Sequence, residues 1–336
     1  MAKVSVLGAG SWGIALARVL HTNGNEVTVW SALGDEISML CEHREHLTKL
    51  PGVKLPDDMI FTQNLEEAVK EKELLVMAVP SPFVRSTAGQ IAAFYDKKQI
   101  IVNVAKGIEE ATLKTLSDVI KDEIPGANVA VLSGPSHAEE VGRGIPTTIV
   151  AGADDRDTAH FVQNLFMNDV FRVYTSPDVL GIEIGAALKN VVALAAGVAD
   201  GLGYGDNTKA ALITRGMAEI TRLGCKMGGR PETFYGLSGV GDLIVTCASM
   251  HSRNRRAGIL IGQGKTMAEA MEEVKMVVEG VHSAKAAKAL ADKYQVSMPI
   301  VEQVNQVLFN NQSAADSVGE LMLRDKKMEI SVDGWK

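Results

Sequence analysis

The strongest constraint on the fold is a short apolar strand followed at once by three spaced glycines. Val4–Leu7 runs into Gly8–Gly13, which reads Gly-Ala-Gly-Ser-Trp-Gly and opens a helical pattern. In this context Gly8 allows a tight turn, Gly10 lets the backbone approach a pyrophosphate, and Gly13 allows close helix–strand packing. Free N–H groups at the helix N-terminus attract the anion. The pattern predicts a dinucleotide-binding unit, against the alternative of a purely structural turn.

Apolar runs alternate with helical patterns through the first half of the chain, as in a mostly parallel, doubly wound sheet of the Rossmann type. Several of the runs are apolar nearly throughout, which is typical of strands covered on both faces. The further predicted strands are Glu26–Trp30, Leu74–Val79, Gln99–Val104, Asn128–Leu132 and Thr147–Ala151. The predicted helices are Ser11–Asn23, Asp35–His46, Leu65–Lys70, Pro82–Phe94 and Thr112–Glu123.

Strand signals end near Ser176-Pro177, and Ala, Leu, Met and Lys dominate from there on. We therefore predict an α/β chain with two domains, a dinucleotide-binding domain over residues 1–176 and an all-helical domain over 177–336, with a cleft between them. The predicted helices of the second domain are Ile182–Ala199, Thr208–Leu223, Thr266–Val274, Ser283–Tyr294, Ile300–Leu308 and Ala314–Leu323.

Composition excludes several classes of protein. The 336 residues hold 34 Lys and Arg against 41 Asp and Glu, a net charge of −7 that argues against nucleic acid as a partner. Cys41, Cys225 and Cys247 are scattered without zinc spacing, which favours a reducing compartment and no metal site. Met1 leads directly into the first strand without an apolar leader, and Val191–Ala199 is far shorter than the ~20 residues of a membrane span. We expect a cytoplasmic protein without membrane insertion.

Two lysines are candidates for chemistry. Lys189 lies in the middle of the apolar helix Ile182–Ala199, where desolvation would lower its pKa toward neutrality and suit it to proton transfer. The alternative is a snorkelling lysine or an ion pair with Glu183 or Asp200. Lys106 follows the strand Gln99–Val104, at the sheet edge where ligands of open α/β sheets bind, unless it is a solvated loop lysine.

Three more segments carry polar or charged side chains that suit a ligand-binding site. Ser133–Ala138 follows a predicted strand, and we expect its His137 to cap or pack against a helix rather than act as a base. Asp242 lies in a predicted glycine-rich loop that allows close backbone approach to a ligand. Ser252–Arg256 is the densest cationic patch, and Arg presents a planar fork to phosphate. Its alternative interpretation is a solvated charge run at a helix start.

The choice between NAD and NADP stays open at this level. An acidic residue about 20 positions after the fingerprint usually binds the ribose 2′-hydroxyl. The second strand is followed by Ser31-Ala32-Leu33, with neither a carboxylate at the strand end nor an Arg nearby. We expect Asp35 and Glu36 in the first turn of the next helix, where the helix dipole favours them.

Together these segments resemble the bacterial NAD(P)-dependent glycerol-3-phosphate dehydrogenases over essentially the whole chain. The resemblance implies reversible hydride transfer between NAD(P)H and dihydroxyacetone phosphate, giving sn-glycerol 3-phosphate for phospholipid synthesis, in a homodimer. It rests on Gly8–Gly13, Val104–Gly107, Ser133–Val141, Leu188–Asn190, Gly201–Asn207, Gly236–Leu243, Ser252–Arg256 and Val278–Gly280.

The same resemblance implies roles for individual residues. Lys189 would exchange the proton at the reacting oxygen, Lys106 would contact substrate and cofactor, and Asp242 would join the polar network around the substrate. Further substrate-binding positions are Gly134, Ser136, Asn190, Ser252, Arg253 and Asn254. Cofactor positions are Gly8, Gly10, Ser11, Trp12, Gly13, Lys106, Ala138, Arg253, Val277 and Glu279, with Val277 the weaker match.

One departure from the family concerns the cofactor. The family often carries Arg or His just after the second strand, and Ser31-Ala32-Leu33 supplies neither, which favours NAD or the use of both cofactors. Two other functions remain as alternatives. One is a related dehydrogenase acting on a carboxylate substrate, of the β-hydroxyacid or ketopantoate type. The other is a non-catalytic protein that senses NAD(P).

Overall fold

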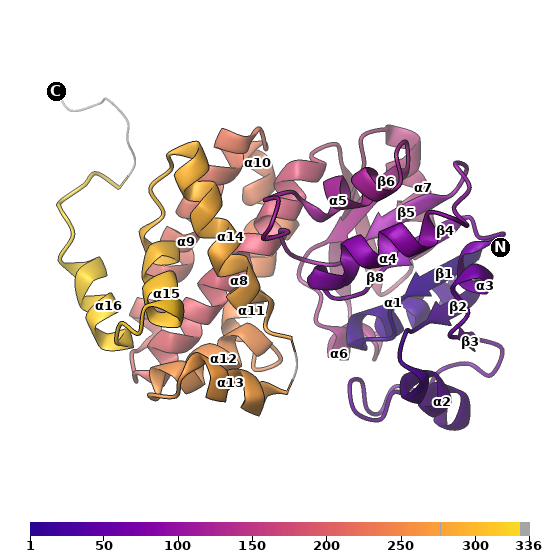
Figure 1. The fold of residues 1–336 in the computed structure, drawn as a ribbon, viewed down its shortest axis with the longest axis horizontal. Coiled ribbons are helices and arrows are strands. Elements are labelled where there is room, and N and C mark those ends of the chain that lie inside the picture. The colour runs from indigo at the N-terminus through magenta and orange to yellow at the C-terminus, as the bar shows by residue number, and fades with distance from the viewer. Residues whose placement is uncertain (276, 330–336) are drawn as a thin grey trace.

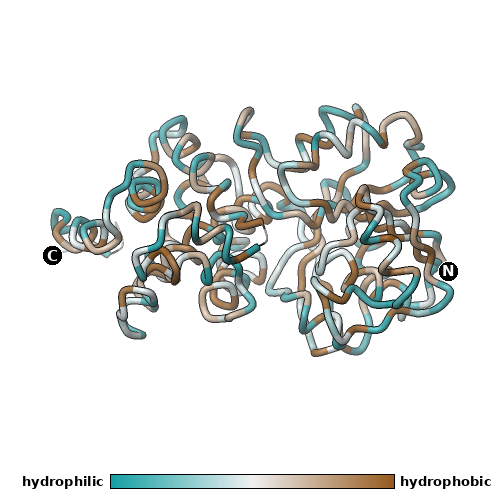
Figure 2. The backbone as a smooth tube through the Cα atoms, turned by 60° about the horizontal axis from the view of Figure 1, so that its bottom comes forward, coloured by the Kyte–Doolittle hydropathy of each residue, from teal (hydrophilic) through white to brown (hydrophobic). Residues whose placement is uncertain are grey.

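The computed structural model describes residues 1–275 and 277–329, and the chain forms an α/β part followed by a helical part (Figure 1). The end of the predicted second domain, 330–336, lies outside the described residues. In Figure 1 the carboxyl ends of the parallel strands face the helical part. Hydrophobic segments run through the sheet and the central helices, while hydrophilic segments gather at outer loops (Figure 2).

The α/β part is built on one eight-stranded sheet with the order β3-β2-β1-β4-β5-β6-β7-β8. All neighbouring strands are parallel except β6 and β7, so the predicted doubly wound, mostly parallel sheet is confirmed. The strands are β1 (Lys3–Leu7), β2 (Glu26–Trp30), β3 (Ile60–Thr62), β4 (Leu74–Met77), β5 (Ile100–Asn103), β6 (Asn128–Ser133), β7 (Thr147–Gly152) and β8 (Phe171–Ser176).

Both faces of the sheet are covered, as the apolar strands predicted. Within β4, Leu74 and Val76 join one hydrophobic cluster, whereas Leu75 and Met77 join a second cluster. Since side chains alternate along a strand, the two clusters lie on opposite faces. The covering helices are α1 (Ser11–Thr22), α2 (Gly34–His43), α3 (Leu65–Val69), α4 (Val84–Ile91), α5 (Leu116–Glu123), α6 (Ala138–Val141) and α7 (Arg156–Phe166).

The two edge strands, β3 and β8, were not predicted. β3 is only three residues long, and β8 alternates buried Phe171 and Val173 with exposed Arg172 and Tyr174. Edge strands lack a neighbour on one side, so they do not need the continuous apolar run that identified the central strands. Helix α7 was also missed, although Asp155 caps it by accepting a hydrogen bond from the Thr158 N–H at 2.8 Å.

The helical part is organised around α8 (Val179–Gly201), which is buried over most of its length. By length and composition α8 would be able to cross a membrane, but its most apolar window is 89% buried inside the protein. The prediction based on Val191–Ala199 alone thus underestimated this helix. Around it lie α9 (Asp206–Met227), α10 (Pro231–Phe234), α11 (Asp242–Ala248), α12 (Arg253–Gly262), α13 (Met267–Val274), α14 (Glu279–Tyr294), α15 (Pro299–Phe309) and α16 (Ala314–Met322).

The chain passes from the sheet to the helices between β8 and α8. Asp178 caps α8 by accepting from the Gly181 N–H at 2.9 Å, and its other carboxylate oxygen accepts from the Arg230 N–H at 2.8 Å and the Thr233 hydroxyl. The predicted division at residues 176 and 177 falls at this passage. That the two parts are separate domains stays a prediction.

Candidate active site

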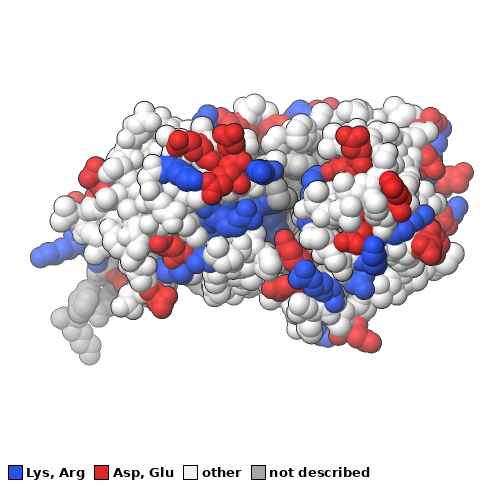
Figure 3. Space-filling view, turned by 90° about the horizontal axis from the view of Figure 1, so that it is seen from below, with Lys and Arg blue, Asp and Glu red and all other residues white. Residues whose placement is uncertain are grey.

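The candidate site lies where the carboxyl ends of the strands meet the helical part. Lys106 follows β5 and Gly134 follows β6, whereas Lys189 and Asp242 come from α8 and α11. On the face drawn in Figure 3, Lys and Arg side chains gather at the hollow between the two parts. An open sheet binds ligands at this edge, so the position agrees with the sequence prediction.

One carboxylate joins the two candidate lysines. The Lys189 ammonium donates to Asp242 Oδ1 at 2.5 Å, and the Lys106 ammonium donates to Asp242 Oδ2 at 2.7 Å. Lys189 also donates to the Thr246 hydroxyl at 2.7 Å, and Lys106 donates to the Gly134 carbonyl at 3.2 Å. The side chains of Lys189 and Asp242 are 6% and 1% exposed, and that of Lys106 is 18% exposed. Two cations thus share one buried anion across the two parts of the molecule.

Burial and mutual charge tune this cluster. Desolvation lowers the pKa of Lys189 to about 7, because the opposing attraction of Asp242 offsets only part of the burial and Lys106 adds repulsion. Burial alone would raise the pKa of Asp242, but the ammoniums of Lys106 and Lys189 outweigh it and lower that pKa. The two ammoniums thus favour the carboxylate form of Asp242, and the lowered pKa of Lys189 suits it to proton transfer near neutral pH.

The alternative interpretations of the two lysines are wrong. Lys189 is buried rather than snorkelling, and it pairs with neither Glu183 nor Asp200. Glu183 accepts hydrogen bonds from the Asn103 amide at 3.1 Å and the Ser117 N–H at 3.0 Å. Asp200 pairs with Arg255 and Lys209. Lys106 is not a solvated loop lysine.

The predicted loop around Asp242 is helical instead. Leu237–Gly241 forms a π-helical turn that leads directly into α11, and Asp242 is the first residue of that helix. Gly239 packs against the backbone of Phe234 so closely that no Cβ would fit. Gly239 thus allows the tight π-helical turn, and this turn places Asp242 at the start of α11, facing the lysines.

Close packing of α12 against α8 places a second polar group beside the lysines. No Cβ would fit at Gly197 of α8 or at Gly258 of α12, because each lies against the backbone of the other helix. Near this contact the Asn254 amide donates to Asn190 Oδ1 at 2.9 Å, and Asn254 Oδ1 accepts from the Gly280 N–H at 2.8 Å. Asn190, next to Lys189, is thereby fixed relative to the start of α12.

Arg253 opens α12 as an unpaired cation. Ser252 caps the helix by accepting from the Arg255 N–H at 3.2 Å. Within the described residues, no hydrogen bond or ion pair reaches the half-buried Arg253 guanidinium. Burial lowers the pKa of Arg253, and Glu279 and Glu139 partly oppose that shift. A desolvated, unpaired guanidinium at a helix start is suited to an anion such as phosphate.

Two other predicted substrate positions lie on the segment after β6. Gly134 has φ +147°, and an added Cβ would lie 3.1 Å from the backbone of Ile149. The Ser136 hydroxyl donates to the Gly134 carbonyl at 2.9 Å, and the same carbonyl accepts from Lys106. This segment therefore borders the lysine cluster.

The glycine turn after β1 fits a dinucleotide. Gly8 has φ +123°, and a Cβ there would lie 2.7 Å from the Ala78 carbonyl. Gly13 packs against Gly8, whereas a Cβ at Gly10 would meet nothing within 4 Å. Ser11 and Trp12 open α1, and the buried Trp12 Nε1–H has no partner among the described residues. Open space beside Gly10 and an orphaned donor are the features expected of a cofactor cradle.

The remaining predicted cofactor positions lie at the junction of the two parts. Glu279 opens α14 and accepts from the Ser81 hydroxyl, which follows β4, at 2.5 Å. Burial raises the pKa of Glu279, although Ser81 and Arg253 oppose the shift. Val277 is half-buried two residues before that helix, and buried Ala138 is the first residue of α6. The Ser81–Glu279 hydrogen bond ties the segment after β4 to the start of α14.

Sequence reasoning missed partners that support the site. Thr246 lies four residues after Asp242 on α11, so the two side chains share one face of that helix. This spacing in the sequence is the signal that could have identified Thr246 as a partner in the site. Ser81 and Asn103 carried no local signal. His137 occupies the N-cap position of α6 without a capping bond, so of its two predicted roles the structure shows packing and not capping. Its ring packs against His251 with centroids 5.7 Å apart.

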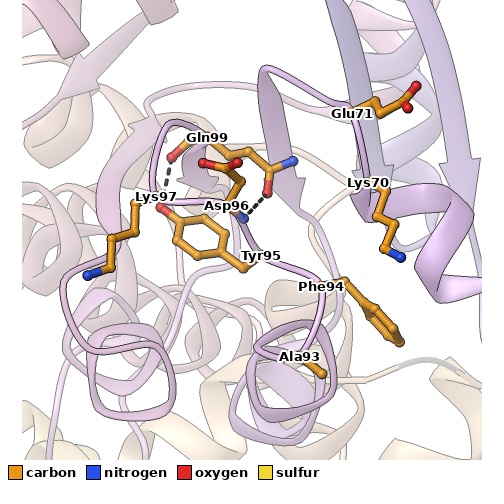
Figure 4. Close-up of a pocket in the computed structure, with 8 residues that line it drawn as sticks. All are labelled: Lys70, Glu71, Ala93, Phe94, Tyr95, Asp96, Lys97 and Gln99. Atoms are coloured by element: carbon orange, nitrogen blue, oxygen red, sulfur yellow. Dashed lines mark hydrogen bonds between the residues drawn. The ribbon is translucent and has the colours of Figure 1, made fainter.

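A separate surface hollow lies at the amino ends of the strands, opposite the carboxyl ends where the lysine cluster lies. It is lined by residues that precede β4 and β5, among them Lys70, Phe94 and Tyr95 (Figure 4). The Tyr95 hydroxyl donates to the Gln99 carbonyl at 2.8 Å. Since these residues lie at the amino ends of the strands, the hollow is distinct from the lysine cluster.

A Rossmann-type cradle that faces a buried lysine–aspartate cluster defines a nicotinamide-dependent oxidoreductase. Models of the NAD-dependent glycerol-3-phosphate dehydrogenase N-terminus and C-terminus match residues 3–159 and 178–319. The chain belongs to this family.

Individual relatives agree over nearly the full length. The glycerol-3-phosphate dehydrogenase (NAD(P)+) of Agathobacter rectalis is 65% identical over 336 residues, covering 100% of both chains. The enzyme of the same name from Bacillus subtilis is 53% identical over 98% of this chain and 96% of its own. The crystal structure of glycerol-3-phosphate dehydrogenase from Coxiella burnetii is 33% identical with a TM-score of 0.93, covering 96% of this chain and 99% of that chain.

Proposed function

We propose that this protein interconverts dihydroxyacetone phosphate and sn-glycerol 3-phosphate with NAD(H) or NADP(H) as the redox partner. The observation that carries the proposal is the buried Lys106–Asp242–Lys189 cluster, to which the Arg253 guanidinium, without a partner among the described residues, adds a free cation. The cluster provides a proton donor for a ketone oxygen, and Arg253 provides the counter-charge for a phosphate.

Lys189 is the proton donor and acceptor in this proposal. When bound, the nicotinamide cofactor supplies the hydride that reduces C2 of the ketone. The Lys189 ammonium donates a proton to the C2 oxygen as negative charge develops there, and in the reverse direction the neutral amine accepts it. A pKa of about 7 lets Lys189 perform both steps near neutral pH.

Lys106 and Asp242 prepare the electrostatics of the step. Lys106 adds positive potential at the oxygen without reorganisation, because Asp242 and the Gly134 carbonyl already hold its ammonium. Asp242 keeps Lys189 oriented and raises its pKa relative to an unpaired buried lysine. Both roles depend on the single carboxylate that bridges the two lysines.

Substrate binding rests on the start of α12 and the segment after β6. The Arg253 fork and the N-terminus of α12 at Ser252 would hold the phosphate, with Asn254, Asn190, Gly134 and Ser136 around it. Phosphate binding away from C2 would orient the reacting carbon and thereby lower the barrier. The cofactor would lie on Gly8, Gly10, Ser11, Trp12 and Gly13, and would reach Lys106, Ala138, Arg253, Val277 and Glu279.

The two alternative functions have no observation in their favour. The Agathobacter relative is named for glycerol-3-phosphate and aligns over the whole chain, whereas a carboxylate substrate would call for a different relative. A sensor without catalysis would have no need of a buried lysine held by an aspartate. As further parts of the proposal, the protein acts in the cytoplasm as a homodimer and supplies glycerophospholipid synthesis.

The test follows the absorbance of NADH and, separately, NADPH after addition of dihydroxyacetone phosphate to the purified protein. Oxidation of either cofactor supports the proposed reaction, and omission of the ketone is the control. Binding of cofactor without oxidation would overturn it. A preference for ketopantoate or a β-keto acid over dihydroxyacetone phosphate would point to the carboxylate alternative.

A further inference from the structure

A cluster of four side chains lies just beyond β2, around the segment Ser31-Ala32-Leu33, which itself carries no charge. It consists of Ser31, Glu36, His46 and Lys49, which we call the β2-end cluster. Ser31 directly follows the last residue of β2, and Glu36 lies in the first turn of α2. His46 and Lys49 come from the segment after α2, which returns to the strand end.

Glu36 is the centre of the β2-end cluster. The Ser31 hydroxyl donates to Glu36 Oε2 at 2.7 Å, and the Lys49 ammonium donates to Glu36 Oε1. The Lys49 N–H donates to His46 Nδ1 at 3.2 Å, so the ring proton is assigned to Nε2, which lies 3.5 Å from Glu36 Oε1. Despite burial, the neighbouring His46 ring and the hydrogen bonds from Lys49 and Ser31 lower the pKa of Glu36 to about 2. The carboxylate is therefore ionised at every working pH.

The position of the β2-end cluster gives it a meaning for cofactor choice. In a Rossmann-type sheet the adenosine ribose lies at the carboxyl end of the second strand, so a 2′-hydroxyl or 2′-phosphate is recognised there. A 2′-phosphate needs unpaired cations, whereas a 2′-hydroxyl needs an acceptor. Lys49 is about one-third exposed at its side chain, but its charge is already paired with Glu36.

We propose that Glu36 is a specificity-determining residue that makes this chain prefer NAD(H) over NADP(H). The Glu36 carboxylate pairs with the Lys49 ammonium, so that this cation is not free to bind a phosphate. The same carboxylate places a negative charge beside the 2′ group of the adenosine ribose. A 2′-phosphate near the β2-end cluster would meet a paired lysine and a like charge. This inference deepens the proposed function and rests on it only in assuming a nicotinamide dinucleotide as the ligand.

The test measures the affinities of NADH and NADPH by fluorescence titration of the full-length protein, without substrate. We expect wild type to bind NADH about tenfold or more tightly than NADPH, a factor equal to about 1.4 kcal/mol. Glu36→Gln removes the charge and frees Lys49, so the NADPH-to-NADH affinity ratio should rise about tenfold. In the double variant Glu36→Gln/Lys49→Gln that gain should disappear, because the freed cation is gone.

Asp35→Asn is the matched control. It makes the same charge change one residue away, on an exposed side chain that lies outside the β2-end cluster, and it should leave the affinity ratio within about twofold. The proposal is overturned if wild type binds NADPH more tightly than NADH. It is also overturned if Glu36→Gln, with thermal stability and NADH binding retained, leaves the ratio unchanged. If Glu36→Gln fails to fold, the wild-type ratio still decides.

Because the titration needs no turnover, it separates two failures. Absence of dihydroxyacetone phosphate reduction with the expected affinity ratios would remove the proposed function and leave the role of Glu36 intact. Reduction of dihydroxyacetone phosphate by a protein that binds NADPH more tightly than NADH would support the proposed function and remove the role of Glu36.

Discussion

Neutralising Asp242 is the most direct perturbation of the candidate site. Asp242→Asn keeps the size of the side chain but removes the charge that lies 2.5 Å from the Lys189 ammonium and 2.7 Å from that of Lys106. Two unit charges 2.5 Å apart attract by about 7 kcal/mol at an effective permittivity of 20 and by about 2 kcal/mol at 80. The lower figure is already more than one pKa unit.

The pKa of Lys189, about 7 in the wild type, should therefore fall by at least about one unit in Asp242→Asn. Above its pKa, each unit lowers the fraction of ammonium about tenfold, so kcat for ketone reduction should fall about tenfold or more at pH 8. The remaining ammonium of Lys106 would depress the pKa of Lys189 further, since the two cations then face each other without a counter-ion.

The assay is the rate of cofactor oxidation at saturating ketone between about pH 6 and pH 9. Wild-type kcat should decline as pH rises through about 7, and the decline in Asp242→Asn should lie at lower pH. Glu219→Gln is the control, because Glu219 is a buried carboxylate that accepts from the Ile300 and Val301 N–H groups, away from Lys189. An unshifted pH profile in Asp242→Asn, with kcat within about threefold of wild type, would refute the reasoning.

Three further changes test other parts of the structure. Lys189→Ala should lower kcat by about 100-fold or more with a smaller change in KM, and near-normal turnover in steady-state assays would contradict the assignment. Arg253→Ala should raise the KM for the phosphorylated ketone about tenfold or more, whereas an unchanged KM would place the phosphate elsewhere. Burial raises the pKa of Glu219 to about 7, so the folded protein holds a proton that the unfolded chain releases above pH 4.5. Stability should thus decline by up to about 3 kcal/mol as pH rises from 4.5 to 7, and Glu219→Gln should reduce that decline in urea unfolding at pH 5 and pH 7. An equal decline in variant and wild type would show that Glu219 does not titrate in this range.

The fold was predictable where burial leaves a strong local pattern. The central strands β4 and β5 are apolar runs because both faces of the sheet are covered, and α8 is apolar all round because helices surround it. The edge strand β8 escaped prediction because only alternate residues are buried. The glycine-rich composition of Leu237–Gly241 predicted a loop, whereas Gly239 is needed there for a tight π-helical turn against the Phe234 backbone.

The candidate site was predictable by residue type but not by partner. Lys189 stood out because a lysine in an apolar helix needs a counter-charge. The nearest acidic residues on either side of it in the sequence are Glu183 and Asp200, whereas the actual partner, Asp242, lies 53 residues away along the chain. Local sequence carries no signal for a pair of that separation, because chain topology alone brings α11 beside α8.

Local patterns along the chain specify the elements whose causes are local: the glycine turn after β1, the alternation of strands and helices, and the polar residues that follow β5 and β6. Which charges meet depends on the three-dimensional fold. The bridge from Lys106 through Asp242 to Lys189 and the pairing of Glu36 with Lys49 join segments from separate elements. Coulomb attraction and desolvation depend on distance in space and on burial, and neither quantity is written in the order of residues.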